Sequence, residues 1–366
     1  MRVIISGGGT GGHIYPALSI ADELRRSGAD VLYMGGRGSA EEKLAAEYGF
    51  AFAAVSTSPL HRHSLKDAAD LLTNAKGMAE AKKIIRDFRA DAAVGTGGFV
   101  TAPVLMAADS LHIPTMIHEQ NAYPGLANRR LAKKAAAVCL TFKDAAGHFP
   151  GGAKLHYTGL PVRPQILAAA KETPPAAYAE FAIPAADRNC PTLLITGGSQ
   201  GAQSLNQAAA DAYEELLAAG IRIIHLCGRK NYQELKAAAP QHPHLILLPY
   251  LERMEYAMSL ADLALARAGA SFLAEAAVMG LPALLVPYPF ATNDHQQANA
   301  DEFAEAGAAV VIADGELNGD VLAKQARAVL EDKERSAAMK AAALSLAKPD
   351  AAKDIARIAM EIARNR

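Results

Sequence analysis

Short apolar runs alternate with alanine-rich stretches along almost the whole chain. The runs have the length and β-branched content of buried strands, and the stretches between them have the composition of helices. Two parallel strands of one sheet need a crossover connection, which is usually a helix and is right-handed. An alternation of strands and helices therefore indicates parallel strands. The alternation therefore predicts an α/β fold built on doubly wound parallel sheets. The expected strands of the first half are RVIIS, DVLYMG, AFAAVS, DAAVGT, PTMIHE, AAVCLTF and KLHYTG.

The alternation of strands and helices begins a second time near the middle of the chain. After a proline- and alanine-rich passage at residues 172–191, a strand, a glycine-rich turn and a helix recur in TLLITGGSQGAQSLNQAAADAYEELLAAG. A chain of 366 residues is also longer than one hydrophobic core usually supports. We therefore expect two domains, residues 1–163 and 164–345, and a C-terminal helix at 346–366 that packs back on the first domain. The expected strands of the second domain are TLLIT, IRIIHLCG, HLILLPY, DLALA, PALLVPY and AAVVIA.

Composition narrows the class of protein. Hydrophobic residues make up 51% of the chain and charged residues 20%, which is typical of a globular protein and excludes a disordered one. The three cysteines, Cys139, Cys190 and Cys227, are far apart, so no disulfide framework and no thiolate metal site is expected. The absence of an apolar leader or of a long apolar run predicts a protein that is neither exported nor threaded through a membrane.

The two halves differ in charge. Residues 1–165 contain 19 Lys and Arg against 14 Asp and Glu, a balance of +5, and the remainder contains 18 against 24, a balance of −6. Chance distribution over solvated surfaces is one interpretation. The other is that the first half faces an anionic partner such as phosphate or a lipid surface, and nucleic acid is not expected.

The glycine loop GGGTGGH follows the first expected strand and precedes a helix. Gly7, Gly9 and Gly12 satisfy G-x-G-x-x-G, a pattern that in this context places backbone N–H groups and a helix N-terminus around an anion. A dinucleotide site also needs an acidic residue at the end of the second strand, and Gly36 and Arg37 stand there instead. NAD is therefore disfavoured, and Arg37 leaves an NADP-dependent oxidoreductase as an alternative.

A second glycine turn, GTGGFVTAP at residues 95–103, follows another expected strand. Either loop alone could serve only close packing of a helix on a strand. Because ligands bind at the carboxyl ends of parallel strands, two such loops and the nearby HEQNAYPG together predict a binding cleft.

The second half offers three more segments at strand ends. GGSQG places Ser199 near a helix start, where its commonest role is an N-cap. RAGASFLAEA starts a helix whose first amides, at residues 270–272, could hold a diphosphate, with Glu275 about one turn inside. Gln296 and Gln297 follow another strand and suit sugar hydroxyls, although paired glutamines are also common at surfaces.

The motifs in this order resemble the MurG family, the N-acetylglucosaminyltransferases that act on lipid I. The resemblance covers nearly the whole chain through GGGTGGH, GTGGFVTAP, HEQNAYPGLANR, GLPVR, GGSQGAQSLN, RAGASFLAEA and HQQANA. It implies the GT-B architecture, two Rossmann-like domains facing a deep cleft, with the acceptor on the N-terminal domain and UDP-N-acetylglucosamine on the C-terminal one. Phe99 stands where some relatives are expected to have Tyr.

The resemblance also implies roles for individual residues. Glu275 is expected to accept hydrogen bonds from the ribose, the Leu251 backbone to read uracil, and His13 to be the catalytic residue near the attacking hydroxyl. The implied substrate-binding residues are Thr10, Gly11, Gly12, Asn121, Arg163, Ser199, Leu251, Arg267, Ala270, Ser271, Phe272, Leu273, Ala274, Glu275, Gln296 and Gln297.

The implied reaction inverts the anomeric centre in one displacement and yields lipid II. The chain has no Asp-x-Asp pair, so helix amides with Arg163 or Arg267 are expected to stabilise the leaving UDP, with no metal and no cofactor. A histidine at a helix N-terminus tends to be neutral, which suits His13 as a general base. The alternative is that His13 only holds its loop through hydrogen bonds.

A lipid acceptor requires peripheral contact with the cytoplasmic face of the inner membrane. Residues 60–88 combine apolar and basic side chains, which either face the core of the domain or form a surface for anionic lipid. The apolar ones are Leu65, Leu71, Leu72, Met78, Ile84, Ile85 and Phe88, and the basic ones are His61, Arg62, His63, Lys82, Lys83 and Arg86. Alternatives to the transferase are the oxidoreductase, a nucleotide-sugar-binding regulator without turnover, and another GT-B transferase or sugar epimerase.

Overall fold

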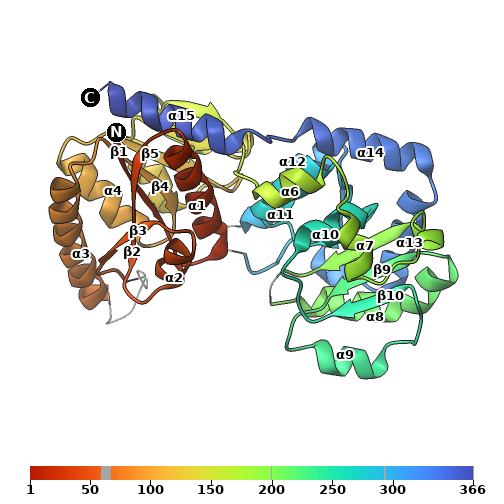
Figure 1. Ribbon diagram of the computed structural model, residues 1–366. Helices are drawn as coiled ribbons and strands as arrows, with labels where there is room; N and C mark the ends of the chain where they lie inside the picture. The colour runs from red at the N-terminus through yellow and green to blue at the C-terminus, as the bar shows by residue number, and fades with distance from the viewer. Residues whose placement is uncertain (59–66, 199, 292–293, 366) are drawn as a thin grey trace. The chain divides into compact units, whose positions relative to one another are not determined.

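The computed structural model describes residues 1–58, 67–198, 200–291 and 294–365. The chain divides into two compact units, unit 1 formed by Met1–Val162 with Lys348–Arg366, and unit 2 formed by Arg163–Ala347. Each unit contains its own parallel sheet covered by helices, as the alternation predicts (Figure 1). The fold class predicted from the sequence is confirmed.

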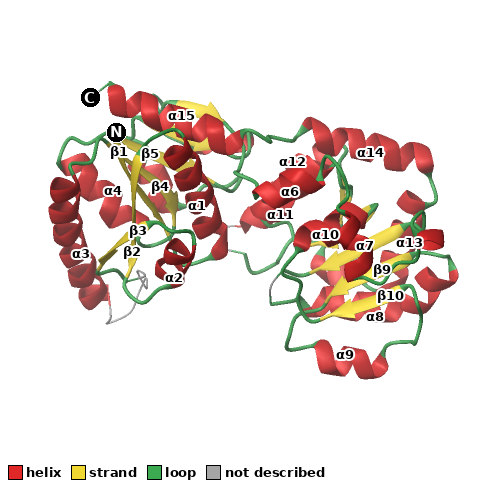
Figure 2. Cartoon of the chain, viewed as in Figure 1, coloured by secondary structure: helices red, strands yellow, loops and turns green. Residues whose placement is uncertain are grey.

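Unit 1 contains a seven-stranded sheet in the order β3-β2-β1-β4-β5-β6-β7. All neighbouring strands pair in parallel (Figure 2), and β1 lies between β2 and β4, with Val3 opposite Val31 on one side and Ala92 on the other. Its strands are β1 (Arg2–Gly7), β2 (Asp30–Gly36), β3 (Ala51–Val55), β4 (Ala92–Gly97), β5 (Thr115–Glu119), β6 (Ala137–Leu140) and β7 (Leu155–Tyr157). Its helices are α1 (Gly11–Arg26), α2 (Ala40–Glu47), α3 (Asp67–Phe88), α4 (Thr101–Ser110), α5 (Leu126–Leu131), η1 (Asp144–His148) and α15 (Ala351–Arg364).

Unit 2 contains a six-stranded parallel sheet in the order β10-β9-β8-β11-β12-β13. Its strands are β8 (Thr192–Thr196), β9 (Arg222–Leu226), β10 (Leu245–Leu248), β11 (Leu263–Ala266), β12 (Ala283–Leu285) and β13 (Ala309–Val311). Its helices are α6 (Pro164–Ala169), α7 (Pro175–Glu180), η2 (Ala185–Asp187), α8 (Gln203–Ala218), α9 (Tyr232–Ala238), α10 (Met254–Leu260), α11 (Ala270–Met279), α12 (His295–Glu305), η4 (Asp314–Glu316), α13 (Gly319–Leu330) and α14 (Lys333–Ser345).

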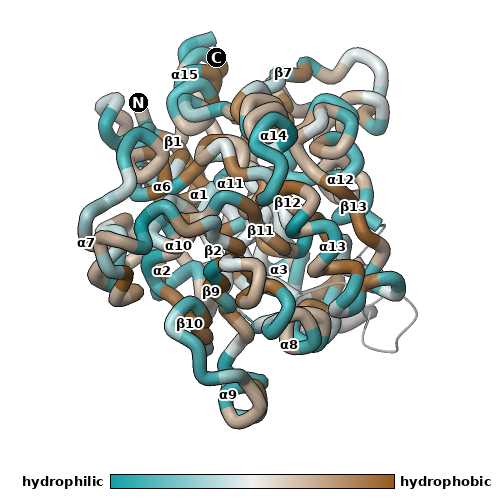
Figure 3. The backbone as a smooth tube through the Cα atoms, turned by 90° about the vertical axis from the view of Figure 1, so that its right-hand side faces the viewer, coloured by the Kyte–Doolittle hydropathy of each residue, from teal (hydrophilic) through white to brown (hydrophobic). Residues whose placement is uncertain are grey.

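The strands are mainly apolar because helices cover both faces of each sheet. Side chains alternate along β1, so Val3 and Ile5 pack in the cluster that contains Leu24 of α1, whereas Ile4 packs in the cluster that contains Val104 of α4. In unit 2, β12 and β13 are likewise hydrophobic, and the helix α14 mixes hydrophilic and hydrophobic residues (Figure 3).

The last helix, α15, belongs to unit 1. Its buried stripe includes Ile355, Ile358 and Ala359, which join the core cluster on the α1 face of the sheet. The charged residues of α15 lie on the opposite face, where Arg357 pairs with Glu361 one turn away. Pro349 precedes α15, consistent with its inability to continue a helix.

Candidate active site

Both sheets have a topological switch point, where strand order reverses; in such sheets, ligands bind beyond the carboxyl ends of the strands at this point. In unit 1 it lies between β1 and β4, and in unit 2 between β8 and β11. The loops that the sequence singled out leave the sheet at these points: GGGTGGH follows β1, GTGGFVTAP includes the end of β4, and RAGAS follows β11.

The two glycine loops of unit 1 touch through their backbones. The Gly8 N–H donates to the Gly97 carbonyl over 3.2 Å, and a Cβ added to Gly98 would lie 2.1 Å from the Gly8 carbonyl oxygen. Gly98 also has a φ of +84°, a backbone conformation that favours glycine. The glycines are therefore required for the close approach of the two loops.

His13 lies in the first turn of α1, where the two loops meet. Its Nδ1 is 3.2 Å from the Gly8 carbonyl oxygen and 3.2 Å from Thr10 Oγ1. The Thr96 hydroxyl donates to the backbone carbonyl of His13 over 2.7 Å. Because a carbonyl oxygen only accepts, the Gly8 contact favours the tautomer with the proton on Nδ1. Nε2 then carries the lone pair that a general base needs.

Space beside the His13 ring depends on Gly97. A Cβ at Gly97 would lie 2.8 Å from His13 Cδ2 and 3.0 Å from Nε2, so any larger residue would displace the ring. Thr10, Gly11 and Gly12 are exposed next to it. The structure thus brings together four of the predicted site residues, and their contacts with substrate stay predictions.

The HEQN segment organises the end of β5. His118 is fully buried, and burial lowers its pKa to about 4, so the ring is neutral. Its Nε2 donates a hydrogen bond to the Gly159 carbonyl over 3.0 Å, and its Nδ1 is 3.2 Å from Gln120 Nε2. The ring therefore links the ends of β5 and β7, a structural role that the sequence did not reveal.

Glu119 shapes the loop that carries Asn121. Its carboxylate accepts from the backbone N–H groups of Asn121 (3.0 Å) and Gly125 (3.2 Å) and from Asn128 Nδ2 (2.8 Å). Burial raises the pKa of Glu119, and these hydrogen bonds oppose the rise. The position of Asn121 is set by this carboxylate.

In unit 2, the helix α11 begins at Ala270 after the N-cap Gly269, and no side chain caps it. Its first residues, Ala270–Phe272, carry no charge, and Ala274 is partly exposed while the Leu273 side chain is fully buried. The helix start thus presents backbone amides and the positive end of its dipole, as expected for an anion site. Ser199 lies outside the described residues.

Glu275 is buried in α11 and forms a bidentate ion pair with Arg163, the first residue of unit 2. Arg163 Nε lies 2.8 Å from Oε1 and Nη2 lies 3.2 Å from Oε2. Burial raises the pKa of Glu275, and Arg163 opposes the rise. The sequence predicted both residues in the site without predicting that they pair.

Arg267 also has carboxylate and carbonyl partners. Its guanidinium donates to Asp314 Oδ1 over 2.6 Å and to Ser204 Oγ over 3.0 Å. It also donates to the carbonyl oxygens of Val286 and Pro287, so it joins the carboxyl ends of β11, β12 and β13. In this structure both arginines predicted to stabilise a leaving diphosphate are held by carboxylates.

The remaining donor-side residues lie on loops and on α12. Gln296 Oε1 accepts from the Tyr288 N–H over 3.0 Å, and Gln297 Nε2 donates to Asp301 Oδ1 over 2.7 Å. Leu251 follows β10, and its side chain is buried. Its backbone role stays a prediction.

Glu41 is a residue that the sequence analysis missed. Its side chain is buried in the first turn of α2, and its carboxylate accepts from the N–H groups of Gly36 (3.1 Å) and Gly9 (3.4 Å). The expected acid was sought at the end of the second strand, and the acid that reaches the glycine loop comes from the next helix. A glycine pair followed by a glutamate in a helix start is the signal that could have found it.

The apolar residues expected near a membrane divide into two groups. Ile85 is buried, and Met78, Ile84 and Phe88 pack partly buried against the core, whereas Leu71 and Leu72 of α3 are 59% and 73% exposed. Leu65 and the basic residues His61, Arg62 and His63 lie outside the described residues. Within the described part of the chain, no helix combines the length and apolar character needed to cross a bilayer. No group of three or more metal-ligating side chains occurs there either.

Comparison with known proteins assigns the chain to a family. The N-terminal domain of glycosyltransferase family 28 matches residues 3–140, and the C-terminal domain of that family matches residues 192–355. The chain belongs to glycosyltransferase family 28. It is a glycosyltransferase with the GT-B fold, so the oxidoreductase interpretation of the glycine loop is wrong.

Curated members of family 28 match over nearly their whole length. The UDP-N-acetylglucosamine--N-acetylmuramyl-(pentapeptide) pyrophosphoryl-undecaprenol N-acetylglucosamine transferase of Halothermothrix orenii is 41% identical over 360 residues, 95% of each chain. The protein of the same name from Symbiobacterium thermophilum is 42% identical over 100% of this chain and 97% of its own.

Solved structures agree with the sequence matches. The crystal structure of Acinetobacter baumannii MurG superposes with a TM-score of 0.79 at 29% identity, over 98% of this chain and 99% of that one. A UDP-GlcNAc 2-epimerase from Neisseria meningitidis reaches a TM-score of 0.69 at 17% identity over 99% and 100% of the two chains, which shows a shared fold alone.

Proposed function

We propose that this glycosyltransferase transfers N-acetylglucosamine from UDP-N-acetylglucosamine to lipid I and so forms lipid II for peptidoglycan synthesis. The observation that carries the proposal is identity of about 41% over 95% of both chains with a transferase of that name. The acceptor atom is the C4 hydroxyl of the N-acetylmuramyl unit.

The donor binds unit 2. The first amides of α11, at Ala270, Ser271 and Phe272, face the diphosphate, where a helix N-terminus stabilises negative charge. Glu275 accepts from the ribose hydroxyls, and the Leu251 backbone reads the uracil. Ser199 lies on the phosphate side, and Gln296 and Gln297 hydrogen-bond the sugar hydroxyls.

The acceptor binds unit 1, whose His13 is the general base. Its Nε2 carries the lone pair because the Gly8 carbonyl holds the proton on Nδ1. Thr10, Gly11, Gly12 and Asn121 are the substrate-binding residues proposed for this unit. His13 Nε2 takes the proton of the attacking hydroxyl, as a histidine of suitable pKa does in general base catalysis.

The chemical step is a single displacement. The C4 oxygen of the acceptor forms a bond to the anomeric carbon while the bond from that carbon to the β-phosphate oxygen breaks. The proton passes to His13, UDP leaves with the electron pair, and the configuration inverts. Charge on the departing diphosphate is stabilised by the α11 amides, together with Arg163 or Arg267 if the donor draws either from its carboxylate.

The enzyme acts from the cytoplasmic face of the inner membrane, as a peripheral protein. The exposed Leu71 and Leu72 of α3 and the exposed Lys83 and Arg86 further along that helix support contact with anionic lipid. Flotation with liposomes that contain anionic lipid compares the wild type with a Leu71→Ser/Leu72→Ser variant and a Lys82/Lys83/Arg86→Ala variant. Weaker flotation of both variants is expected, and flotation equal to wild type by both contradicts the contact.

Transfer of labelled sugar to a lipid I analogue tests the function. Labelled product is expected with UDP-N-acetylglucosamine, and UDP-N-acetylgalactosamine serves as the control donor. No product with the first donor overturns the proposed function. Equal use of both donors overturns the role of Gln296 and Gln297 alone.

A further inference from the structure

The Glu41 carboxylate lies in a cradle made by glycines. A Cβ at Gly8 would be 2.5 Å from Glu41 Oε1, and a Cβ at Gly35 would be 2.7 Å from Glu41 Cγ. The side chain is 1% exposed, and its two oxygens accept from the N–H groups of Gly36 and Gly9. Gly8 and Gly35 therefore leave room for the Glu41 side chain.

Backbone amides after the first strand of a nucleotide-binding fold usually face a phosphate. In unit 1 a carboxylate of the chain itself accepts from one such amide, at Gly9, and from the Gly36 amide at the end of β2. A buried carboxylate needs hydrogen-bond donors to stay ionised, and backbone amides in fixed positions supply them. The Gly7–Thr10 loop is thus hydrogen-bonded, through the Gly9 N–H, to the Glu41 side chain at the start of α2.

The Gly7–Thr10 loop is the one that orients His13. The peptide between Gly8 and Gly9 carries the amide that Glu41 accepts from, and the Gly8 carbonyl lies 3.2 Å from His13 Nδ1. The Gly8 N–H is held by the Gly97 carbonyl on the other side. The Tyr33 hydroxyl also donates to the Gly7 carbonyl over 2.6 Å.

We propose that Glu41 is a positioning residue for His13. Its carboxylate fixes the Gly8–Gly9 peptide so that the Gly8 carbonyl accepts from Nδ1–H, which leaves the lone pair of the neutral imidazole on Nε2. The kinetic part of this inference rests on the proposed function, in which His13 is the base. The tautomer of His13 can be read without any substrate.

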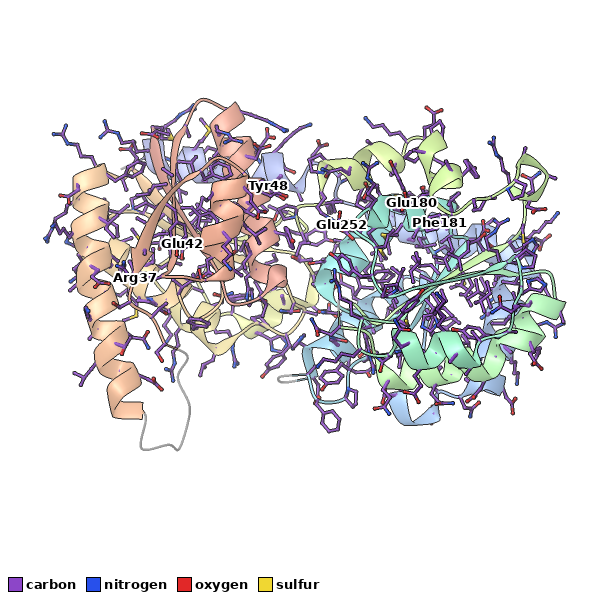
Figure 4. All side chains as sticks on the ribbon, turned by 60° about the horizontal axis from the view of Figure 1, so that its bottom comes forward. Arg37, Glu42, Tyr48, Glu180, Phe181 and Glu252 are labelled. Carbon is purple, nitrogen blue, oxygen red and sulfur yellow. The ribbon has the colours of Figure 1, made fainter. Side chains whose placement is uncertain are left out.

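Glu41→Gln replaces one acceptor oxygen by an NH₂ group that cannot accept from a backbone N–H. The matched control is Glu42→Gln, since Glu42 is the next residue on α2 and is only partly buried, with its carboxylate accepting from the Gly38 N–H (Figure 4). In protein with ¹⁵N-labelled histidine, the His13 ring signals are assigned by their loss in a His13→Gln variant. Wild type and Glu42→Gln are expected to show protonated Nδ1 and unprotonated Nε2, and Glu41→Gln a mixture of tautomers.

Kinetics give the second readout. Glu41→Gln is expected to lower kcat about 10- to 100-fold, because a displaced base loses alignment, with the donor KM changed by less than about twofold. Val31→Ala, a core substitution in the same unit, controls for a general loss of stability. If Glu41→Gln does not fold, Glu41→Asp is the second variant, because its carboxylate lies on a side chain shorter by one methylene. It is expected to change the His13 tautomer and kcat in the same direction as Glu41→Gln.

An unchanged His13 tautomer together with a kcat equal to that of Glu42→Gln overturns the proposal. A drop in kcat matched by Val31→Ala at the same loss of stability also overturns it. If the wild type transfers no sugar at all, the proposed function fails, and the tautomer measurement alone decides the role of Glu41.

Discussion

The switch points of the two sheets use the same strand–loop–helix arrangement in different ways. In unit 1, the loop before α1 is fastened on both sides, by Glu41 and by the Gly97 carbonyl, and the first turn of the helix carries an imidazole. In unit 2, the first turn of α11 carries no ionisable side chain, and the buried carboxylate of that helix pairs with an arginine instead of backbone amides.

The difference indicates a division of labour. A loop whose amides bind a carboxylate of its own chain is suited to holding a side chain still, which is what a base requires. A helix start that presents only amides is suited to receiving an anion from outside. Under the proposed function, the same fold serves proton transfer in unit 1 and donor binding in unit 2.

The largest expected effect tests the first half of this comparison. His13→Ala is expected to lower kcat by about 10²- to 10⁴-fold, since it removes the proposed general base, and to leave the donor KM within about twofold. Steady-state transfer to a lipid I analogue measures both constants. His156→Ala, an exposed histidine of unit 1, is the control. A loss smaller than tenfold removes His13 from the role.

Each unit contains a buried histidine that makes its stability depend on pH in acid. Burial lowers the pKa of His118 in unit 1 to about 4 and that of His225 in unit 2 to about 3, from an ordinary value of 6.5. Below about pH 6.5 the unfolded chain binds protons that these buried rings do not, so stability falls as the pH is lowered. The fall contributed by His118 ends near pH 4, and that contributed by His225 continues toward pH 3.

Urea unfolding at several pH values measures this loss. Each buried histidine contributes a slope of about 1.4 kcal/mol per pH unit within its window. His118→Gln and His225→Gln are each expected to remove one such contribution, and His156→Gln none. A His118→Gln protein with the slope of the wild type would show that His118 titrates normally.

The contact between the glycine loops of unit 1 gives the smallest effect. Gly98 and Gly28 have nearly equal φ angles, +84° and +85°, but an added Cβ meets the Gly8 carbonyl at Gly98 and nothing within 4 Å at Gly28. Gly28→Ala is therefore expected to cost about 1 kcal/mol from backbone conformation alone. Gly98→Ala should cost about 1–3 kcal/mol more in thermal or urea unfolding. Equal losses would contradict the close contact of the two loops.

Much of the fold follows from local pattern. Every apolar run that the sequence analysis named contains a strand, because continuous apolar character is what a strand covered on both faces requires. The glycine loops and His13 were also predicted, since they sit next to one another in sequence at a strand end.

The parts of the site that pattern did not reveal depend on residues distant in sequence. Arg163 and Glu275 are 112 positions apart, and Glu41 reaches Gly9 across 32. The rule that predicts an acid at the end of the second strand pointed to Gly36 and Arg37. That rule does not consider a carboxylate that belongs to the following helix. Only the fold shows that Gly8 and Gly35 make room for it.

The donor dissociation constant tests the division of labour most directly. Calorimetric titration with UDP-N-acetylglucosamine compares wild type, His13→Ala, Glu275→Gln and the exposed control Glu234→Gln. We expect Glu275→Gln to weaken binding about tenfold, because a neutral amide replaces a charged acceptor, and His13→Ala and Glu234→Gln to bind like the wild type. Weakening by His13→Ala as large as that by Glu275→Gln, or none by Glu275→Gln, would contradict the assignment of the donor to unit 2.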